Sequence, residues 1–401
     1  MGALLLLADG CAVKQKPAAA PVAPGAFVTS DGERLDGPAL AKALERADYV
    51  LVGETHDSPV DHKAQAALLE AVATAGRQPP VGLEMLPHTR FDAALRRFSQ
   101  GLIAVDELPG ALDWQRSWGY DFALYRPLFE AAQRHRLPLF GLNIDNDARK
   151  AVSRKGLEGL TVRETRALPL GIVPPLPAQR AELAAFFSSH STMISQRAGR
   201  AKTEPQTAGP ATGRIAGSGA SAQGAPSGLA SASAEGTARL ERFLLIQSIW
   251  DSVMAEQAVK VRRSAGGPVV VLAGGGHVEK GYGIAHRLRV YDPGASVMTV
   301  MPYSGARPEG GADLFFYSPE RKRFGLRFED GNGAPLVASV VPGSPAERAG
   351  LKAGDRVLGA GGRKIAKTLD LHAAAVAARD KEEALVLDVE RAGKTLRLTL
   401  E

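Results

Sequence analysis

The feature that most constrains the fold of this chain is the alternation of short apolar runs with segments of helical spacing. Residues 49–52, 80–85 and 138–143 are apolar runs of strand length, and two more follow at 268–273 and 296–301. The segments between the first three carry apolar residues at three- and four-residue intervals, as a helix with one buried face requires. Strands that alternate with helices form βαβ units, in which the strands run parallel. The sequence therefore predicts an α/β domain with a mainly parallel sheet flanked by helices.

Reactive side chains stand at the ends of these predicted strands. Gly53 stops the first run and is followed by Glu54 and His56, and Gly274 stops the fourth run and is followed by His277. Because ligands bind beyond the carboxyl ends of the strands in an open α/β sheet, we expect both Gly-x-x-His motifs to contribute to one composite site. A pair of purely structural turns is the alternative. The other polar residues at strand ends are Asp57, Glu84, Asn143 and Asp145.

These groups suit metal binding and hydrolysis. His56, His277, Glu54 and Glu84 form the mixed nitrogen and oxygen set that binds a divalent metal such as Zn, Mn or Co. Either glutamate would then serve as the general base toward a metal-polarised water in a hydrolase. A hydrogen-bonded structural role is the alternative for each histidine, and Glu54 can equally anchor a turn. The sequence contains no Gly-x-Ser-x-Gly, P-loop or dinucleotide-binding motif, which argues against a serine hydrolase and against nucleotide binding.

The N-terminal region predicts a lipid anchor. An apolar run that includes Leu4–Leu7 precedes Cys11, the only cysteine of the chain, and residues 12–25 form a tether rich in Pro and Ala. A short apolar run before a cysteine resembles a bacterial lipoprotein signal, in which that cysteine is lipidated. We therefore expect residues 1–25 to be a signal remnant and tether, and the protein to lie at the bacterial cell envelope, on the periplasmic face of the outer membrane. An unmodified cysteine in an irregular terminus is the alternative.

Length, charge and composition set further limits. A chain of 401 residues is long enough for two or three domains, at roughly 100–200 residues per domain. The net charge of +6 comes without basic clusters that interleave with aromatic residues, so nucleic acid is not an expected partner. Residues 201–237 are rich in Gly, Ala, Ser, Pro and Thr, and we expect them to be a disordered insertion within an α/β domain of residues 26–310. A linker between two domains is the alternative.

Residues 323–401 differ in character from the rest of the chain. Residues 344–355, Ser-Pro-Ala-Glu-Arg-Ala-Gly-Leu-Lys-Ala-Gly-Asp, resemble the signature of bacterial PDZ domains. The resemblance implies a groove that accepts a peptide as an added strand. A PDZ fold that only packs against its own neighbour is the alternative. The implied peptide-binding residues are Phe324, Gly325 and Leu326, whose amides would hold a C-terminal carboxylate, and Leu371 in the opposite wall.

Four motifs of the predicted α/β domain resemble a single bacterial family. They are residues 52–57 (Val-Gly-Glu-Thr-His-Asp), 82–85 (Gly-Leu-Glu-Met), the Trp- and Tyr-rich 114–125, and 273–278 (Ala-Gly-Gly-Gly-His-Val) with Gly281-Tyr-Gly283. Together they are similar to the ChaN family of haem-binding lipoproteins linked to iron uptake, within a superfamily that includes the Tiki and TraB proteins and erythromycin esterase. The resemblance spans residues 40–305. It implies a site that combines both Gly-x-x-His motifs with Glu84, haem as the ligand, and a homodimer that shares the haem site.

The resemblance leaves two functions open. Haem binding needs an axial Tyr or His ligand beside a flat apolar surface. In the Tiki and esterase branches, similar positions serve hydrolysis. We therefore expect a haem- or iron-binding envelope protein first, and a metal-dependent hydrolase, either a peptidase or an esterase, second. The candidate haem-binding residues are Tyr120, Tyr125, Tyr282 and His277, with Trp114 and Trp118 as stacking partners and plain core packing as the alternative for each tyrosine.

Overall fold

The computed structural model describes residues 22–188, 227–320, 324–329, 333–366, 368–381 and 383–400. Its larger unit is an eight-stranded sheet in which five of the strand pairs are parallel and the two pairs that involve β1 are antiparallel. The prediction of a mainly parallel α/β sheet is therefore confirmed. In sheet order the strands are β2 (Arg34–Leu35), β1 (Phe27–Thr29), β8 (Leu314–Tyr317), β7 (Val297–Tyr303), β3 (Tyr49–Glu54), β6 (Val269–Gly274), β4 (Val81–Pro87) and β5 (Leu139–Asn143).

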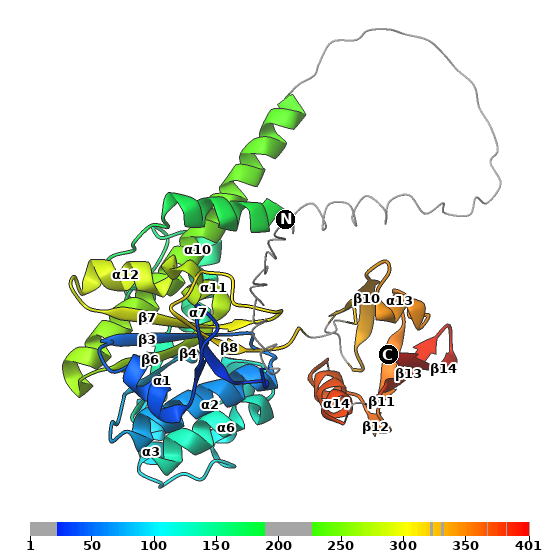
Figure 1. The fold of residues 1–401 in the computed structure, drawn as a ribbon. Coiled ribbons are helices and arrows are strands. Elements are labelled where there is room, and N and C mark those ends of the chain that lie inside the picture. The colour runs from blue at the N-terminus through cyan, green and yellow to red at the C-terminus, as the bar shows by residue number, and fades with distance from the viewer. Residues whose placement is uncertain are drawn as a thin grey trace, which may run out of the picture.

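Helices cover both faces of this sheet (Figure 1). A separate apolar core lies on each face, because the central strands are buried on both sides and point alternate residues to opposite layers. The helices of one layer are α1 (Gly37–Ala43), α2 (Pro59–Thr74), α3 (Asp92–Ser99) and α6 (Phe122–Arg134), and those of the other are α7 (Asn146–Lys155), α10 (Ser227–Ala265), α11 (Gly275–Val278) and α12 (Ile284–Tyr291). The shorter elements are α4 (Leu108–Ala111), α5 (Trp114–Ser117), α8 (Val162–Thr165) and η1 (Glu279–Gly281).

Helix α2 shows why these elements begin where they do. The Ser58 side chain accepts a hydrogen bond from the backbone N–H of Asp61, and Pro59 occupies the first helical position, where no N–H is needed. The buried face then repeats at helical spacing through Ala64, Leu68, Leu69 and Val72, as predicted. This local pattern fixes α2 against β3 and so places the residues that follow Gly53.

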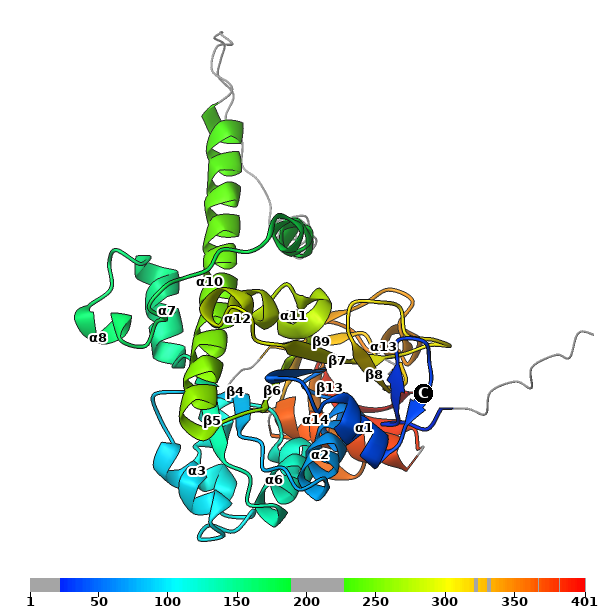
Figure 2. The same cartoon turned by 60° about the vertical axis from the view of Figure 1, so that its left-hand side comes forward.

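Helix α10 begins earlier than the sequence suggests. Residues 201–226 of the predicted insertion lie outside the described residues, but Ser227 and the residues after it are already helical. Alanine is frequent at this start, and alanine has the highest helix propensity. Figures 1 and 2 show the first half of α10 extending beyond the two layers, whereas its second half packs on the sheet.

The smaller unit is an antiparallel six-stranded sheet with its own apolar core. Ser344 caps α13 as its sequence pattern indicates, and Gly325 has a φ of +74°, where an added Cβ would lie 2.3 Å from the Ser344 Cβ. Leu371 is 5% exposed and belongs to the core. The elements are β9 (Leu326–Glu329), β10 (Leu336–Val340), α13 (Pro345–Arg348), β11 (Arg356–Ala360), β12 (Arg363–Lys364), α14 (Thr368–Asp380), β13 (Leu385–Arg391) and β14 (Lys394–Leu400).

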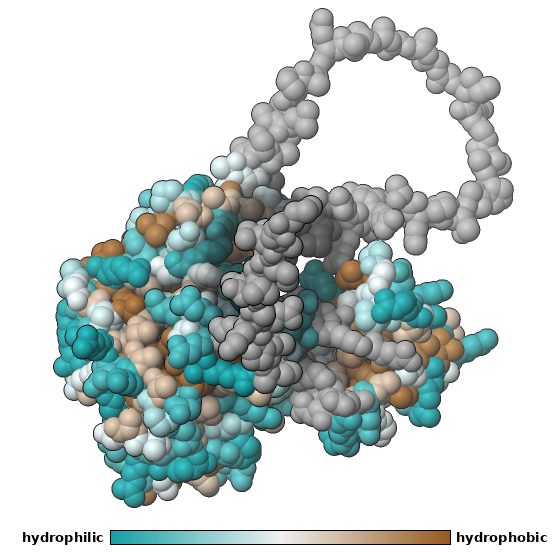
Figure 3. Space-filling model, in the orientation of Figure 1, coloured by the Kyte–Doolittle hydropathy of each residue, from teal (hydrophilic) through white to brown (hydrophobic). Residues whose placement is uncertain are grey.

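The surface seen in Figure 3 is mostly hydrophilic, with hydrophobic residues in small separate groups. Among the described residues, no helix combines the length and apolar character needed to cross a membrane. Cys11 and the other residues of the predicted lipid anchor lie outside the described part of the chain.

Candidate functional site

The site lies at the carboxyl ends of three neighbouring central strands. β6 pairs in parallel with both β3 and β4, so that Glu54 stands opposite Gly274 and Leu83 opposite Leu272. β4 does not end at Glu84 but continues to Pro87, and its pairing with β5 is irregular between Leu83 and Pro87. The structure therefore brings the two Gly-x-x-His motifs and Glu84 to one edge of the sheet.

The carboxylate of Glu54 is the buried centre of this site. Its Oε1 lies 2.9 Å from His56 Nδ1 and accepts a 2.9 Å hydrogen bond from the Tyr125 hydroxyl. Its Oε2 accepts a 2.7 Å hydrogen bond from Gln65 Nε2 and lies 3.2 Å from His62 Nδ1. Burial alone would raise the pKa of Glu54, but the positive charge of His62 and the hydrogen bond from His56 hold that pKa far below its usual range. Glu54 is therefore ionised and fully engaged.

His62, in the first turn of α2, contacts the same carboxylate of Glu54. Its side chain is fully buried, and its Nε2 lies 3.1 Å from the backbone oxygen of His56. Burial lowers the pKa of His62, but the charge of Glu54 and its hydrogen bond raise that pKa above its ordinary value. Both ring nitrogens face acceptors, so His62 is a buried structural cation.

His56 presents one ring nitrogen to solvent-accessible space. The ionised carboxylate of Glu54 can only accept a hydrogen bond, so Nδ1 of His56 carries a proton. In the neutral imidazole, Nε2 then keeps its lone pair. The ring packs edge-on against Trp118, with 4.8 Å between centroids, and lies 5.3 Å from the Tyr120 ring. Burial lowers the pKa of His56, but the Glu54 hydrogen bond and the charge of Glu84 raise it. The side chain is 28% exposed.

Gly274 sets the close approach of β6 to the His56 ring. A Cβ at this position would lie 2.6 Å from His56 Cε1 and 3.0 Å from its Nε2. The backbone N–H of Gly274 also donates a 2.5 Å hydrogen bond to Glu84 Oε2. Only glycine therefore permits the observed placement of the His56 ring.

We predict that Gly274→Ala displaces the His56 ring while the fold persists. The added methyl group must push the imidazole away from Glu84, at a cost of about 1–3 kcal/mol for a crowded site. Gly276→Ala is the matched control, because a Cβ there meets nothing within 4 Å. Histidine ring signals in a proton–nitrogen NMR spectrum should shift at His56 in the first variant only. Unchanged His56 signals in Gly274→Ala would contradict this account of the glycine.

His277 is held by a second buried carboxylate, which comes from α10. Its Nδ1 lies 2.6 Å from Asp251 Oδ1, and its Nε2 lies 3.5 Å from Glu84 Oε1. Burial lowers the pKa of His277, but the charges of Glu84 and Asp251 and the Asp251 hydrogen bond outweigh burial and raise that pKa to about 9. His277 is therefore a cation at neutral pH. The Trp250 ring stands edge-on to it, with 5.9 Å between centroids.

A cavity of about 380 Å³ opens over these groups. Of the predicted residues, His56, Glu84, His277 and Tyr120 line it, whereas Glu54 lies beneath it. Its walls come from separate elements, because Arg116 to Tyr120 run from the end of α5 into the turn after it, and Asn143 to Arg149 run from the end of β5 into the start of α7. The remaining lining residues include Met85, Pro87, Arg90, Arg116, Trp118, Asn143, Ile144, Asp145, Asp147, Arg149 and Trp250.

Two of the predicted tyrosines do not reach this cavity. Tyr125 is fully buried, and its hydroxyl donates to Glu54 Oε1 and, at 3.2 Å, to the backbone oxygen of His56. Burial and the charge of Glu54 raise the pKa of Tyr125 strongly, so this phenol stays neutral and serves as a donor. Tyr282 is not among the cavity-lining residues, and its backbone oxygen accepts a hydrogen bond from Arg287. Trp114 packs edge-on against Tyr125 in the core.

The predicted metal set is not arranged as a coordination sphere. Within the described ranges, no group of three or more His, Cys, Asp or Glu side chains is placed to hold a metal ion. Glu54 directs both oxygens at protein donors, and one oxygen of Glu84 accepts from the backbone of Gly274. The fold thus brings the four side chains together, but their nitrogen and oxygen atoms contact one another and other protein groups instead of surrounding a common point.

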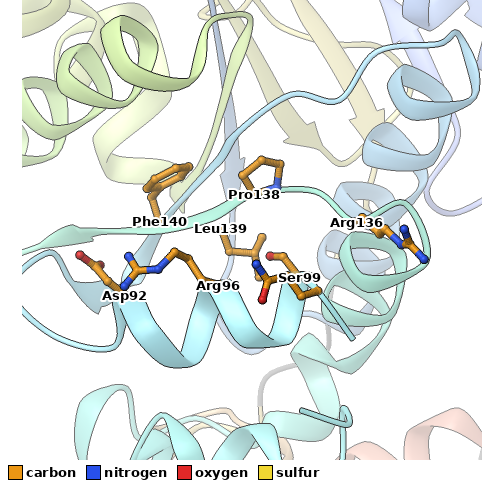
Figure 4. Close-up of a pocket in the computed structure, with 8 residues that line it drawn as sticks. Asp92, Arg96, Ser99, Arg136, Pro138, Leu139 and Phe140 are labelled. Carbon is orange, nitrogen blue, oxygen red and sulfur yellow. The ribbon is translucent and has the colours of Figure 1, made fainter. Parts of the chain in front are cut away.

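A larger cavity of about 510 Å³ lies elsewhere, between α3 and β5 (Figure 4). Asp92, Arg96 and Ser99 of α3 line it on one side and residues 138–140 on the other, where Leu139 points toward α3, and Arg136 lies at one end. It contains none of the predicted site residues and no histidine. Volume alone therefore does not locate the reactive groups of this protein.

Several residues of the site were missed in the sequence. Asp251 and Trp250 lie within a long apolar helix, and Gln65 lies on the buried face of α2. The available signal was a carboxylate flanked by Ile249 and Val253 at positions that the helical spacing buries. A buried carboxylate needs a partner, so Asp251 could have been assigned to a buried cation in advance.

The fold and this strand-end pair of histidine–carboxylate units define an α/β ligand-binding domain joined to a PDZ domain. The family model described as "Haem-binding uptake, Tiki superfamily, ChaN" matches residues 40–288, and a PDZ domain model matches residues 323–401. The first match covers more than half of the chain, so the chain belongs to the ChaN family of the Tiki superfamily. The resemblance inferred from the motifs is thereby confirmed, as is the PDZ domain.

Three solved structures are similar to parts of this chain. The structure of cofacial heme binding to ChaN of Campylobacter jejuni is 18% identical, covers 73% of this chain and 96% of that chain, and has a TM-score of 0.50. The HtrA3 PDZ domain bound to a phage-derived ligand is 23% identical over 20% of this chain and 83% of that chain, with a TM-score of 0.18. A mutant of the erythromycin esterase EreC in its open conformation is 12% identical, covers 72% of this chain and 81% of that chain, and has a TM-score of 0.37.

 No curated protein matches the chain significantly.

Proposed function

We propose that the strand-end cavity binds haem, with His56 as the residue that meets the iron. The observation that carries this proposal is the state of the His56 ring: Nδ1 is fixed by a buried carboxylate, and Nε2 is left to face the cavity. Haem-ligating and metal-ligating histidines have this arrangement, because an acceptor on one nitrogen fixes the ring and makes the other nitrogen more basic. Bound haem would supply the iron chemistry of the site.

The cavity walls suit the rest of a haem group. Trp118 and Tyr120 beside His56 and Trp250 beside His277 offer aromatic surface to a flat ring. Arg116 lies in one wall, and Arg149 lies in another with its guanidinium 5.8 Å from the centre of the Trp250 ring. Such cations would pair with the propionate groups of the ligand. Tyr120 is the second candidate for the iron, although burial raises the pKa of its phenol and so disfavours the ionised ligand form.

We also propose that two copies of the chain share the bound haem. The cavity volume of about 380 Å³ is at the small end of ligand sites, and a large planar ligand in it would keep one face uncovered. A second haem on a second copy would cover that face. The ChaN of Campylobacter jejuni is described by its cofacial heme binding, which supports this arrangement as a proposal for the present chain.

The test is a haemin titration of the purified chain. We predict a shifted Soret band that saturates at one haemin per chain, and a loss of at least about tenfold in affinity in His56→Ala, since one good ligand bond exceeds 1.4 kcal/mol. His135→Ala is the control, because that histidine pairs with Glu70 away from the cavity. No Soret shift in the unmodified protein would refute haem binding, and an unchanged spectrum in His56→Ala would move the iron ligand to Tyr120.

Hydrolysis is a second candidate, and the two histidine–carboxylate pairs favour it. Glu84 stands between the cationic His277 and the His56 ring, so the cavity holds a carboxylate for general-base work beside a donor for developing negative charge. The measurement is turnover of ester and peptide substrates by the unmodified chain and by Glu84→Gln. Equal rates for the two proteins would remove this candidate.

We propose that the PDZ domain captures C-terminal peptides beside β9. Gly325 has the positive φ and close approach to Ser344 that keep the backbone before β9 in its turn, as a carboxylate-binding loop requires. We predict that hydrophobic C-terminal peptides bind and that amidation of their termini weakens binding at least about tenfold, through loss of charge-assisted hydrogen bonds. Fluorescence polarisation with paired free and amidated peptides measures this. Equal affinity would refute carboxylate capture.

We further propose that the protein is lipidated on Cys11 and held at the periplasmic face of the bacterial outer membrane. The apolar run before Cys11 and the Pro/Ala-rich residues 12–25 support this placement. Mass spectrometry of the protein from its own membranes should find an acylated cysteine at the new N-terminus. Cys11→Ser should then move the protein from the membrane fraction to the soluble fraction.

A further inference from the structure

We propose that Gln179 and Arg287 are positioning residues that hold Asp251, and through it the His277 imidazole, in the cavity wall. The proposal deepens the haem-binding function and rests on it for the ligand. Gln179 belongs to the helix of residues 177–188, which precedes the part of the chain that the structure does not describe. Neither residue lines the cavity, so any effect on the ligand must pass through His277.

The contacts form a continuous buried chain. Gln179 Oε1 accepts a 2.7 Å hydrogen bond from Arg287 Nη1, and Gln179 Nε2 donates a 3.1 Å hydrogen bond to Asp251 Oδ2. Arg287 Nη1 also lies 3.3 Å from Asp251 Oδ2. The other oxygen of Asp251 lies 2.6 Å from His277 Nδ1. Gln179 therefore closes a triangle with an ion pair whose carboxylate faces the imidazole.

Burial makes this arrangement informative. Gln179 is 5% exposed, Asp251 1% and Arg287 0%. A buried ion pair seldom stabilises a fold more than apolar residues of the same volume would, because both charges lose their hydration. The ion pair is better explained by the way it orients Asp251. Because Arg287 and Gln179 engage Oδ2, the other oxygen, Oδ1, can face only His277. That oxygen fixes the proton of His277 on Nδ1 and turns Nε2 toward Glu84.

Contacts of the same helix reach both sides of the site. Glu182 accepts a 2.8 Å hydrogen bond from Lys280, which lies three residues after His277, and Arg180 pairs with Glu241 of α10. The helix therefore bridges η1, which directly follows the helix that carries His277, and α10, which carries Asp251. A change in the position of residues 177–188 would reach His277 through Gln179.

The test is a double-mutant cycle on haemin affinity. Gln179→Leu keeps the approximate volume and removes both hydrogen bonds, and it should weaken haemin binding about 10–100-fold, as loss of a supporting partner does. In a His277→Ala background the same change should have an effect within about twofold, because its route to the ligand is gone. Ala185→Ser, at an exposed position of the same helix and outside these contacts, is the control and should leave affinity unchanged. A loss in Gln179→Leu that is equally large with and without His277 would show a general structural role and overturn the proposal.

A second measurement on the ligand-free protein separates this proposal from haem binding itself. The Nδ1 proton of His277 should give a slowly exchanging downfield proton signal that Asp251→Asn abolishes and Gln179→Leu broadens or shifts. If the unmodified chain binds no haemin but shows this behaviour, the haem function fails and the positioning role stands. If the His277 signal is the same in Gln179→Leu, the positioning role fails, whatever haemin does.

Discussion

Replacement of Glu54 by alanine is expected to destabilise the α/β domain by about 3–5 kcal/mol, the largest effect of any single change at the site. The side chain is completely buried and receives hydrogen bonds or close contacts from His56, His62, Gln65 and Tyr125. Removal of the carboxylate leaves all four donors without their acceptor and leaves the His62 cation without its counter-charge. Each buried group without a partner costs about 1–3 kcal/mol, so the substitution lowers the free energy of unfolding of the whole domain.

Urea unfolding followed by tryptophan fluorescence measures this change in the right domain, because Trp114, Trp118 and Trp250 are the only tryptophans and all belong to the α/β domain. Glu130→Ala, an exposed glutamate on α6, is the matched control and should change stability by no more than about 0.5 kcal/mol. Glu54→Gln should fall between the two, since its amide keeps one acceptor but directs a donor at groups that already donate. A Glu54→Ala protein as stable as the control would refute the central role of this carboxylate.

We expect the free energy of unfolding of the α/β domain to fall as the pH rises from 6.5 to about 9. The pKa of His277 is raised from 6.5 in the unfolded chain to about 9 in the fold. Its contribution is therefore fully present below pH 6.5 and is lost as the pH rises through 9, and the shift corresponds to roughly 3 kcal/mol. His56 and His62, whose pKa values are also raised, act in the same direction. Glu54 has the opposite sign: its lowered pKa gives stability that is present above its unfolded value and lost in acid.

Asp251→Asn isolates the His277 part of this dependence. Asparagine keeps an acceptor near Nδ1 but removes the charge, so the variant should be less stable at pH 6 and the gap to the unmodified protein should narrow toward pH 10. The narrowing should be smaller than the roughly 3 kcal/mol of the whole shift, because the charge of Glu84 also raises the pKa of His277 and is kept in the variant. Glu182→Gln, which removes the charge of an exposed glutamate paired with Lys280, should show a gap that does not change over this range. Free energies of unfolding at several pH values give the comparison. A gap for Asp251→Asn that is constant with pH would contradict the coupling of the two side chains.

Local patterns predicted the elements that carry the site. The apolar runs before Gly53 and Gly274 became β3 and β6, and their Gly-x-x-His motifs meet as expected. The pattern could not predict β1, β2 and β8, because strands of two to four residues carry too few positions to show a period. It also could not predict the strand order, which depends on tertiary packing.

The roles within the site were harder to predict than its location. Tyr125 and Tyr120 are five residues apart in one aromatic segment, yet one is a buried donor to Glu54 and the other lines the cavity. That difference depends on which side of α6 faces the sheet, and no motif records it. The role of His62 is hidden from the sequence for the same reason: its partners Glu54 and Gln65 are recognisable only when the β3–α2 turn is folded.

The position of β6 has a consequence for how the chain is made. β3 and β4 are consecutive in synthesis, but β6, which follows them by more than 180 residues, lies between them in the sheet. A nascent chain that has not yet released β6 from the ribosome therefore has no completed sheet centre, and it lacks Gly274, which packs on His56, together with His277. The candidate site and the centre of the sheet are thus completed in the same late step of biosynthesis, so a product truncated before β6 lacks both.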